Sequence, residues 1–323
     1  MMKKLLIILL TLALLMGTAG GEKAEEHPEN EGAAAPAVID RTADPAAFSD
    51  FAFPAEAKIL HIWFPNIMNA DEAILLYDGC VWLIDCGDER MGARGAELIR
   101  KLEIPRIDKI LNSHPHHDHL NGLRATDKAA KVEELALCFT EGDIRPASSR
   151  KHLRNALAYA EKNGITVSSF AEGDVLAMGD GGVTLTCYIN PDPKLDLNNR
   201  SAQMMLRCGE RTILFTADME KPGQEAMLAR LPEESFKADI LKYPHHGKSA
   251  MDDAFLEAVD PEIAVITNQK VEKWKGIMYL KKLKIPYVYT NVYHHINNKT
   301  KKPLYLHLMT DGKHWVMERA ELD

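Results

Sequence analysis

Four histidines and one aspartate lie within the seven residues Ser113 to His119. The run follows the apolar stretch 107–111, which has the composition of a strand. Its members fit the pattern HxHxDH: His114, His116, Asp118 and His119. Two alternating imidazoles can hold one metal ion while the Asp-His pair reaches a second, and His117 falls outside this spacing. The run therefore predicts a metal site on a loop at the end of a strand.

Two further apolar runs end in residues that can bind metal. The stretch 213–217 ends in Asp218, and the stretch 239–244 ends in His245 and His246. A single acid at a strand end is more often a turn or cap residue, and a short histidine tract often binds metal only adventitiously. Three strand ends that carry ligands in one chain favour a built metal site.

Five segments together resemble the metallo-β-lactamase superfamily, and within it the hydrolase domain of ComEC-type DNA-uptake proteins and their secreted stand-alone relatives. They are Leu83-Ile84-Asp85-Cys86-Gly87, the HxHxDH run, Asn198-Asn199-Arg200-Ser201, Thr216-Ala217-Asp218 and Leu241-Lys242-Tyr243-Pro244-His245-His246-Gly247. The resemblance covers residues 56 to 310, and the Pro-His-His-Gly segment points to the ComEC-like branch. It implies an α/β fold, the αββα metallo-β-lactamase-like sandwich of two mixed sheets flanked by helices, with the metals at one edge between the sheets.

The resemblance also implies roles for individual residues. His114 and His116 would bind the first metal, Asp118 and His119 the second, and Asp218 would bridge both. Either His245 or His246 would complete the second site. The residues expected to be catalytic are Asp118, Asp218 and His246.

Three more residues are candidates close to the metals. Asp85 resembles the acid that orients the ligand loop, although an acid before Gly87 is equally the pattern of a turn, and both can hold. Lys242 and Lys248 flank the histidine pair and are candidate substrate contacts, against the default of a solvated lysine.

The chain departs from the superfamily pattern in two places. Many members supply another histidine between the HxHxDH run and the bridging acid, but residues 153 to 244 contain none. Asn190 or Asp192 offers an oxygen ligand there, whereas Asn-Pro-Asp is also the pattern of a turn, which we favour. ComEC-type chains usually carry a Gly/Asp-rich stretch near the start, and of this only the tail is recognisable within residues 64–73.

The N-terminus has the pattern of a secretory signal. Lys3 and Lys4 precede the apolar run Leu5 to Leu15, and Gly17-Thr18-Ala19 offers a cleavage site. We expect residues 1–19 to be a signal peptide, 20–50 a disordered linker rich in Ala, Glu and Pro, and 51–323 the hydrolase domain. The protein would be secreted or extracytoplasmic, with no stable membrane span after cleavage, and an uncleaved N-terminal anchor is the less favoured alternative. No cysteine precedes Cys80 to carry a lipid anchor.

Alternating strand-like and helix-like segments agree with an α/β fold. Strands are expected at 58–64, 73–77, 80–85 and 263–267, and helices at 92–102, 150–160, 224–231 and 253–259. Five cysteines leave at least one unpaired in an exported chain. Cys187 and Cys208 are a candidate pair, and buried free thiols are the equal alternative.

The net charge of −8 argues against indiscriminate binding of nucleic acid. The segment 268–323 is locally basic, with eleven Lys and Arg against five acids and with interleaved aromatic residues. Such a segment can form a track for a polyanion, but a solvated face over core aromatics is the favoured interpretation.

Imidazole and carboxylate ligands favour zinc, most simply two ions, with manganese as the main rival. A metal-bound hydroxide at neutral pH implies hydrolysis. We expect an exported metal-dependent hydrolase of small-molecule or polyanionic phosphodiesters, with nucleic acid among the candidate substrates. The alternatives are a lactone, ester or β-lactam hydrolase, and a non-catalytic surface binding protein with a vestigial metal site.

Overall fold

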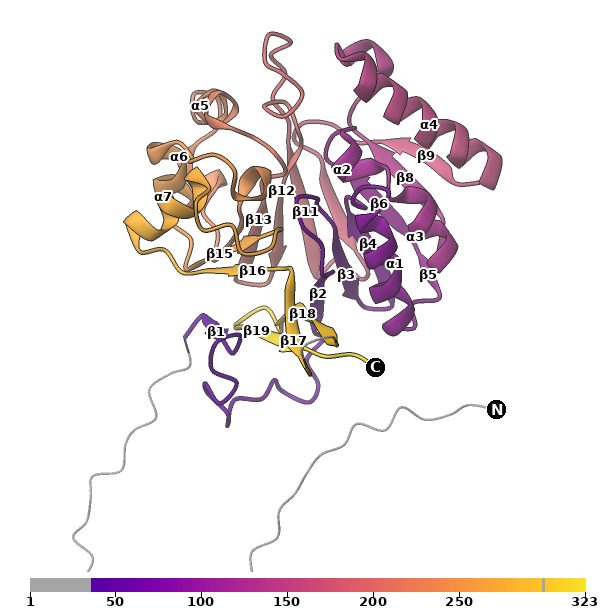
Figure 1. Cartoon of the computed structure of the whole chain (residues 1–323). Coiled ribbons are helices and arrows are strands. Elements are labelled where there is room, and N and C mark those ends of the chain that lie inside the picture. The colour runs from indigo at the N-terminus through magenta and orange to yellow at the C-terminus, as the bar shows by residue number, and fades with distance from the viewer. Residues whose placement is uncertain (1–35, 298–299) are drawn as a thin grey trace, which may run out of the picture. The chain divides into compact units, whose positions relative to one another are not determined.

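The computed structural model describes residues 36–297 and 300–323. The predicted signal peptide and residues 20–35 of the predicted linker lie outside the described residues. In the described part, two large sheets pack face to face and helices cover their outer faces (Figure 1). The predicted αββα sandwich is confirmed.

The first sheet contains ten strands in the described part of the chain. In spatial order they are β1 (Val38–Asp40), β19 (Trp315–Ala320), β18 (Lys301–Thr310), β2 (Leu60–Phe64), β3 (Ala73–Tyr77), β4 (Cys80–Ile84), β6 (Lys109–Asn112), β8 (Glu134–Leu137) and β9 (Thr166–Ser169), with β17 (Val292–His295) paired to β18. The second sheet contains β10 (Val175–Met178), β11 (Val183–Tyr188), β12 (Gln203–Cys208), β13 (Arg211–Phe215), β14 (Ile240–Lys242), β15 (Ile263–Ile266) and β16 (Tyr287–Tyr289). A separate short pair is formed by β5 (Arg106–Ile107) and β7 (Lys131–Val132).

The helices are α1 (Met91–Lys101), α2 (His117–Leu120), α3 (Leu123–Ala129), α4 (Ala147–Asn163), α5 (Lys221–Leu228), α6 (Asp253–Val259) and α7 (Lys275–Leu283). Short 3-10 turns lie at Glu141–Asp143, Glu233–Ser235 and Pro244–Gly247. All eight elements expected from sequence periodicity are present, with ends shifted by a few residues. Helix α4 is longer than expected and ends where Gly164 adopts the left-handed conformation at φ 67°.

Each large sheet has a parallel half. Strands β4, β6, β8 and β9 run parallel, as do β13, β14, β15 and β16. Parallel strands end at the same edge of a sheet, and ligands in such sheets gather outside these ends. The carboxyl ends of β6, β13 and β14 therefore bring the ligand segments after residues 112, 215 and 242 towards one another.

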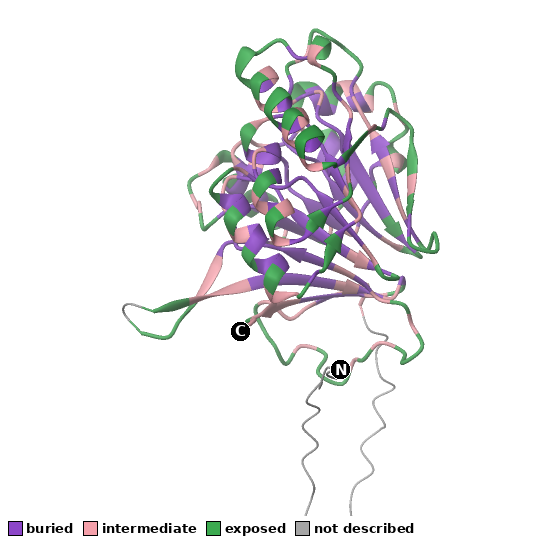
Figure 2. Ribbon diagram, turned by 90° about the vertical axis from the view of Figure 1, so that its right-hand side faces the viewer, coloured by how far each residue is buried: buried purple, intermediate pink, exposed green. Residues whose placement is uncertain are grey.

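The core has three layers, and buried residues concentrate in the sheets while exposed residues lie on the outer helices (Figure 2). The inward faces of both sheets meet in one cluster, in which Leu75 and Leu206 are fully buried. The outer face of the first sheet packs on α1, α3 and α4 through residues such as Leu98 and Leu153. The outer face of the second sheet packs on α5, α6 and α7, where Phe255 and Ile277 are fully buried.

The domain begins earlier in the chain than expected. Val38–Asp40 form β1, which pairs in parallel with β19, and the Arg41 side chain donates hydrogen bonds to the carbonyls of Ala47 and Phe48. Residues 38–50 therefore belong to the folded domain and not to a disordered linker. A three-residue strand is too short to show a periodicity of its own, so only its pairing with β19 reveals it.

Two further expectations can be compared with the fold. All five cysteines are free, and β11 pairs with β12 so that Cys187 and Cys208 lie at opposite ends of the two strands. The basic C-terminal segment forms a solvated face over core aromatics, because Tyr305 and Trp315 are buried while Lys281 and Lys302 make ion pairs with nearby acids.

Within residues 36–297 and 300–323, none of the helices has the length and hydrophobicity needed to cross a bilayer.

Candidate metal centre

The HxHxDH run lies on the loop that leaves β6 and on the single turn of α2. His114 and His119 are fully buried, Asp118 is nearly so, and His116 is half-buried. His114 Nε2 and His116 Nδ1 lie 3.0 Å apart, so both imidazoles face the same point. The loop is fixed from the second sheet, since the backbone N–H of Ala202 donates to the carbonyl of Ser113 at 2.9 Å.

The remaining candidate ligands come from the second sheet. Asp218 follows β13 and His246 follows β14. Ala217, His245 and His246 all adopt positive φ, between 42° and 55°. Such a conformation costs a non-glycine residue on the order of 1–3 kcal/mol, so packing must hold it. Part of that support is the hydrogen bond from His245 N–H to the Ala217 carbonyl.

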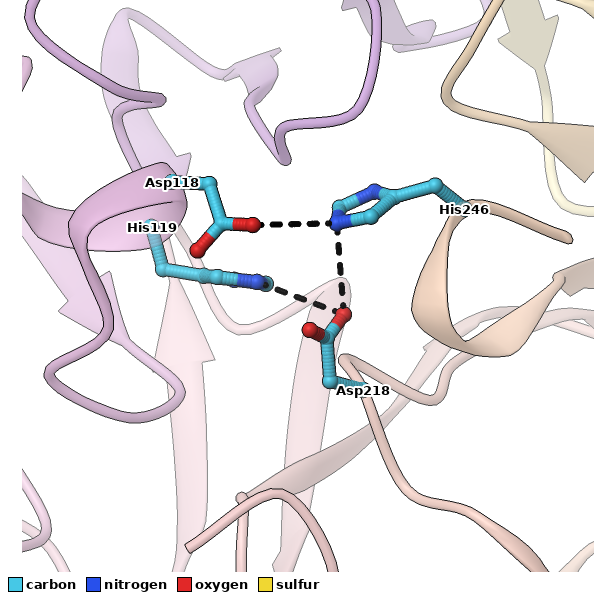
Figure 3. A group of neighbouring side chains, drawn as sticks. All are labelled: Asp118, His119, Asp218 and His246. Carbon is cyan, nitrogen blue, oxygen red and sulfur yellow. Dashed lines mark ion pairs between the residues drawn. The ribbon is translucent and has the colours of Figure 1, made fainter. Parts of the chain in front are cut away.

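Asp118, His119, Asp218 and His246 point their side chains towards one another (Figure 3). His119 Nε2 lies 3.3 Å from Asp218 Oδ1, and His246 Nε2 lies 3.5 Å from both Asp218 Oδ1 and Asp118 Oδ2. Ligands about 2.1 Å from a tetrahedral zinc ion stand roughly 3.4 Å from each other. The four side chains therefore have the spacing of a metal site.

A second group shares Asp218 with the first. His114, His116 and Asp218 also bring one ligand atom each within 4.8 Å of one another. Together the two groups contain the residues expected from the HxHxDH run, the bridging acid and one histidine of the downstream pair.

The atoms that face this space lack other partners. His119 Nε2, His246 Nε2 and Asp218 Oδ1 are buried and have no hydrogen-bond partner among the described residues. Buried polar atoms are rarely left so unless an ion or water belongs there. These residues fit a divalent cation.

Asp218 and His114 have the protonation states that a cation requires, whereas His119 and His246 must each release a proton. Burial alone would lower the pKa of both imidazoles, but Asp218, together with Asp85 at His119 and Asp71 at His246, raises it. Burial alone would raise the pKa of Asp218, but His119 and His246 lower it well below the usual value. Burial, and then the neighbouring His119 and His116, lower the pKa of His114 well below its usual value. Asp218 is thus ionised and His114 neutral, as metal ligands must be.

Asp85 holds both the ligand loop and His119. Its carboxylate accepts hydrogen bonds from the Ser113 N–H and hydroxyl and from the Asn112 amide, and it lies 2.7 Å from His119 Nδ1. A carboxylate on the far nitrogen of an imidazole sets the tautomer and direction of the ligand nitrogen. Asp85 thus contacts the ligand loop as an orienting acid would, and it also lies in a turn, where its own φ is 57°.

Asp71 plays the matching part for His246, and sequence reasoning missed it. Its Oδ1 lies 3.2 Å from His246 Nδ1 and accepts a hydrogen bond from Thr267. Lys242 is buried and its ammonium binds Asp71 and the Ala217 carbonyl. Lys242 is therefore neither solvated nor open to a substrate, and the expectation that it contacts substrate is replaced by a role in holding Asp71.

The structure separates the two histidines of the downstream pair. His246 belongs to the four-residue group, whereas His245 Nε2 lies 3.7 Å from Asp218 and its Nδ1 lies 2.9 Å from Glu220. Lys248 lies at the rim, with its ammonium 3.2 Å from His245 Nε2, and remains a candidate substrate contact. His117 lies outside both groups, with its side chain 59% exposed.

Neither residue considered for the missing histidine lies in a ligand group. The Asn190 amide donates to the carbonyls of Asn199 and Gly223, and exposed Asp192 accepts from the Lys194 N–H, as in a turn. Asn198 was not singled out as a ligand. Its Oδ1 is buried without a partner among the described residues, on the segment that Ala202 ties to the ligand loop. The two adjacent asparagines before β12, Asn198 and Asn199, were the sequence feature that could have pointed to Asn198.

Sequence comparison matches this part of the chain to a known family. The model of the metallo-β-lactamase superfamily matches residues 73–136, which contain Asp85 and the HxHxDH run. ComE operon protein 3 of Bacillus subtilis is 27% identical over 172 residues, which are 53% of this chain and 21% of that protein. The uncharacterised protein YcaI of Escherichia coli is 28% identical over 79 residues, or 24% of this chain and 10% of that one. The chain thus spans a small part of the curated relatives that it matches.

Solved structures of similar fold include the metallo-β-lactamase fold protein YhfI from Bacillus subtilis, with a TM-score of 0.46 and 16% identity over 72% of this chain and 96% of that one. The metallo-β-lactamase MIM-1 from Novosphingobium pentaromativorans has a TM-score of 0.39 and 16% identity over 68% of this chain and 85% of that one. Residues 73–136, the segment that holds Asp85 and the HxHxDH run, thus match the metallo-β-lactamase superfamily, and the chain is similar to ComE operon protein 3 over a longer stretch.

Proposed function

We propose that this protein is an exported metal-dependent hydrolase that acts on phosphodiesters with two metal ions, zinc or manganese. The superfamily consists generally of hydrolases, which supports the reaction class. The observation that carries the proposal is the pair of ligand groups that share Asp218. The phosphodiester substrate rests on the resemblance of the Pro-His-His-Gly segment to ComEC-type DNA-uptake proteins, with which the similarity to ComE operon protein 3 agrees, and the signal-like N-terminus supports export.

Divalent cations bound there would supply Lewis acidity and lower the pKa of a water molecule. The protein's own residues keep the site in order. Asp85 and Asp71 direct the ligand nitrogens of His119 and His246 inward, and the buried walls exclude bulk water. Lys248, at the rim, is placed to attract an anionic group of the substrate.

Histidine variants test the ligand assignment. We expect His119→Ala and His246→Ala each to lower turnover by about 100-fold or more, because each removes a nitrogen from the four-residue group. His117→Ala is the matched control, since it changes a histidine of the same run that points to solvent. His245→Ala should have a smaller effect than His246→Ala. Steady-state kinetics together with metal content decide, and loss of turnover in His117→Ala with metal retained would show the assignment to be wrong.

A substrate panel tests the reaction. A bis-aryl phosphodiester should be hydrolysed with a kcat/KM at least about tenfold higher than that of a lactone or a β-lactam, a difference of about 1.4 kcal/mol in the transition state. The reason is that two cations can clamp the anionic oxygens of a phosphodiester. Turnover of lactones or β-lactams alone would favour the second class of hydrolase. Inactivity of fully metal-loaded protein on every substrate would favour a binding protein.

A further inference from the structure

A cavity of 670 Å³ lies on the far side of α2 from the ligand groups. Its walls come from the end of α2, from α3 and from one face of α4, with Leu120, Leu123 and Ala156 as apolar parts. These elements lie together beside the first sheet (Figure 1). None of the candidate metal ligands lines this cavity.

The cavity is positively charged. Arg124, Lys128 and Lys162 line it, and Glu89 is the one acid among the lining residues. Within the described residues, none of these three cations makes an ion pair or a side-chain hydrogen bond. The lysines at the C-terminal side differ, since Lys281 and Lys302 are paired with acids. Three cations without acidic partners around one hollow create a potential that attracts anions.

The cavity wall also contains uncharged polar side chains, and one of them is held in place by a hydrogen bond. The Tyr159 hydroxyl donates to Asp127 at 2.9 Å, which holds its ring in the cavity wall. His152 and Asn155 add groups that can donate hydrogen bonds. Arginine and lysine placed together suit a phosphate group, because arginine binds two of its oxygens at once and lysine adds a point charge.

The cavity and the candidate metal centre lie next to the same helix, α2. Helix α2 has four residues and is about 6 Å long. Asp118 and His119 on it face the metal groups, while Leu120 lines the cavity. His117 is exposed between them, with its ring centre 6.1 Å from that of His152. The cavity and the ligand groups therefore share one short helix, with the exposed His117 ring between them.

We propose that the cavity between α3 and α4 binds a second phosphate of the substrate, so that the enzyme acts on oligomeric phosphodiesters and holds them at a position removed from the bond that is cut. This inference rests on the proposed function for its account of the substrate. The binding step itself needs only the cavity and its cations.

The test compares two double charge reversals. Arg124→Glu/Lys128→Glu changes the cavity, and Lys282→Glu/Lys284→Glu makes the same change in net charge at the end of α7, outside the cavity. A labelled oligothymidylate twelve nucleotides long is titrated by fluorescence anisotropy against metal-free protein at several salt concentrations. Turnover of a bis-aryl phosphodiester, which has one phosphate, is measured on metal-loaded protein, and circular dichroism checks the fold.

The cavity variant should bind the oligonucleotide at least about tenfold more weakly, and its salt slope should fall by about 0.7, the value for one lost phosphate contact on a single strand. It should hydrolyse the bis-aryl diester as the parent does, and the α7 variant should match the parent in both assays. The inference is overturned if the parent does not bind the oligonucleotide, if the cavity variant binds it unchanged, or if both variants lose binding equally.

Failure of the proposed function would look different. If the parent binds the oligonucleotide through the cavity but hydrolyses neither it nor the diester, the phosphate site stands and the hydrolase does not. If the cavity variant fails to fold, the single variant Lys162→Glu on the exposed face of α4 replaces it. This variant should also bind the oligonucleotide more weakly than the parent, by a smaller factor.

Discussion

Replacing Asp218 by alanine is expected to remove most of the metal from both sites and to lower turnover by about 1000-fold or more, since bound cations contribute several kcal/mol to transition-state stabilisation. Asp218 is the one residue shared by the two ligand groups. Its Oδ1 lies 3.3 Å from His119 Nε2 and 3.5 Å from His246 Nε2. The carboxylate therefore cannot be lost from one group without loss from the other.

Metal content after purification without chelators, measured by mass spectrometry, checks this expectation. The parent should hold roughly two equivalents, and Asp218→Ala well below one. Asp192→Ala is the control, because Asp192 is an exposed acid of a turn outside both groups. Parent protein that stays metal-free when zinc or manganese is added, or an Asp218→Ala variant with full metal content, would contradict the shared-ligand arrangement.

Lys242→Met should destabilise the fold by about 3–5 kcal/mol, because it leaves the Asp71 carboxylate buried without its cation. Both side chains are almost fully buried, at 3% and 7% exposure. Burial alone would raise the pKa of Asp71, but Lys242 and then His246 lower it below its usual value. The ion pair thus keeps Asp71 charged where it orients His246.

Urea unfolding measures the loss, and the double variant Lys242→Met/Asp71→Asn should recover part of it by removing the stranded charge. Lys237→Met breaks an ion pair with Asp260 in which both side chains are mostly exposed, and it should cost at most about 1 kcal/mol. Equal losses in the Lys242 and Lys237 variants would show that burial does not set the strength of the Lys242 pair.

The parts of the site that sequence could predict follow apolar strands. The HxHxDH run and Asp218 each follow, within a few residues, a run whose composition indicates a strand, and parallel strand ends meet at one edge. Asp71 lies in an irregular segment before β3, so no periodicity marks it. Its role appears only when Thr267 and Lys242, far apart in the chain, pack around it.

Other features of the site depend on how the chain packs, so the sequence could not predict them. His245 and His246 are neighbours of the same type, and only the packing separates them: Asp71 lies beside His246 Nδ1, whereas Glu220 lies beside His245 Nδ1. Lys242 lies on β14, between β13 and β15 in the middle of the second sheet, so its burial is a property of the sheet. The cavity between α3 and α4 depends on how two helices meet, which residue type alone does not specify.

The division of the ligands between the two sheets has a consequence for folding order. The ligand loop and α2 follow β6 of the first sheet, whereas Asp218 and His246 follow β13 and β14 of the second. Bringing them together requires contacts across about a hundred residues of chain, and such non-local contacts form slowly. Neither sheet alone contains a complete set of ligands, so a metal ion meets its full site only after the two sheets have docked. Capture of the metal is then a late event that locks an already assembled sandwich.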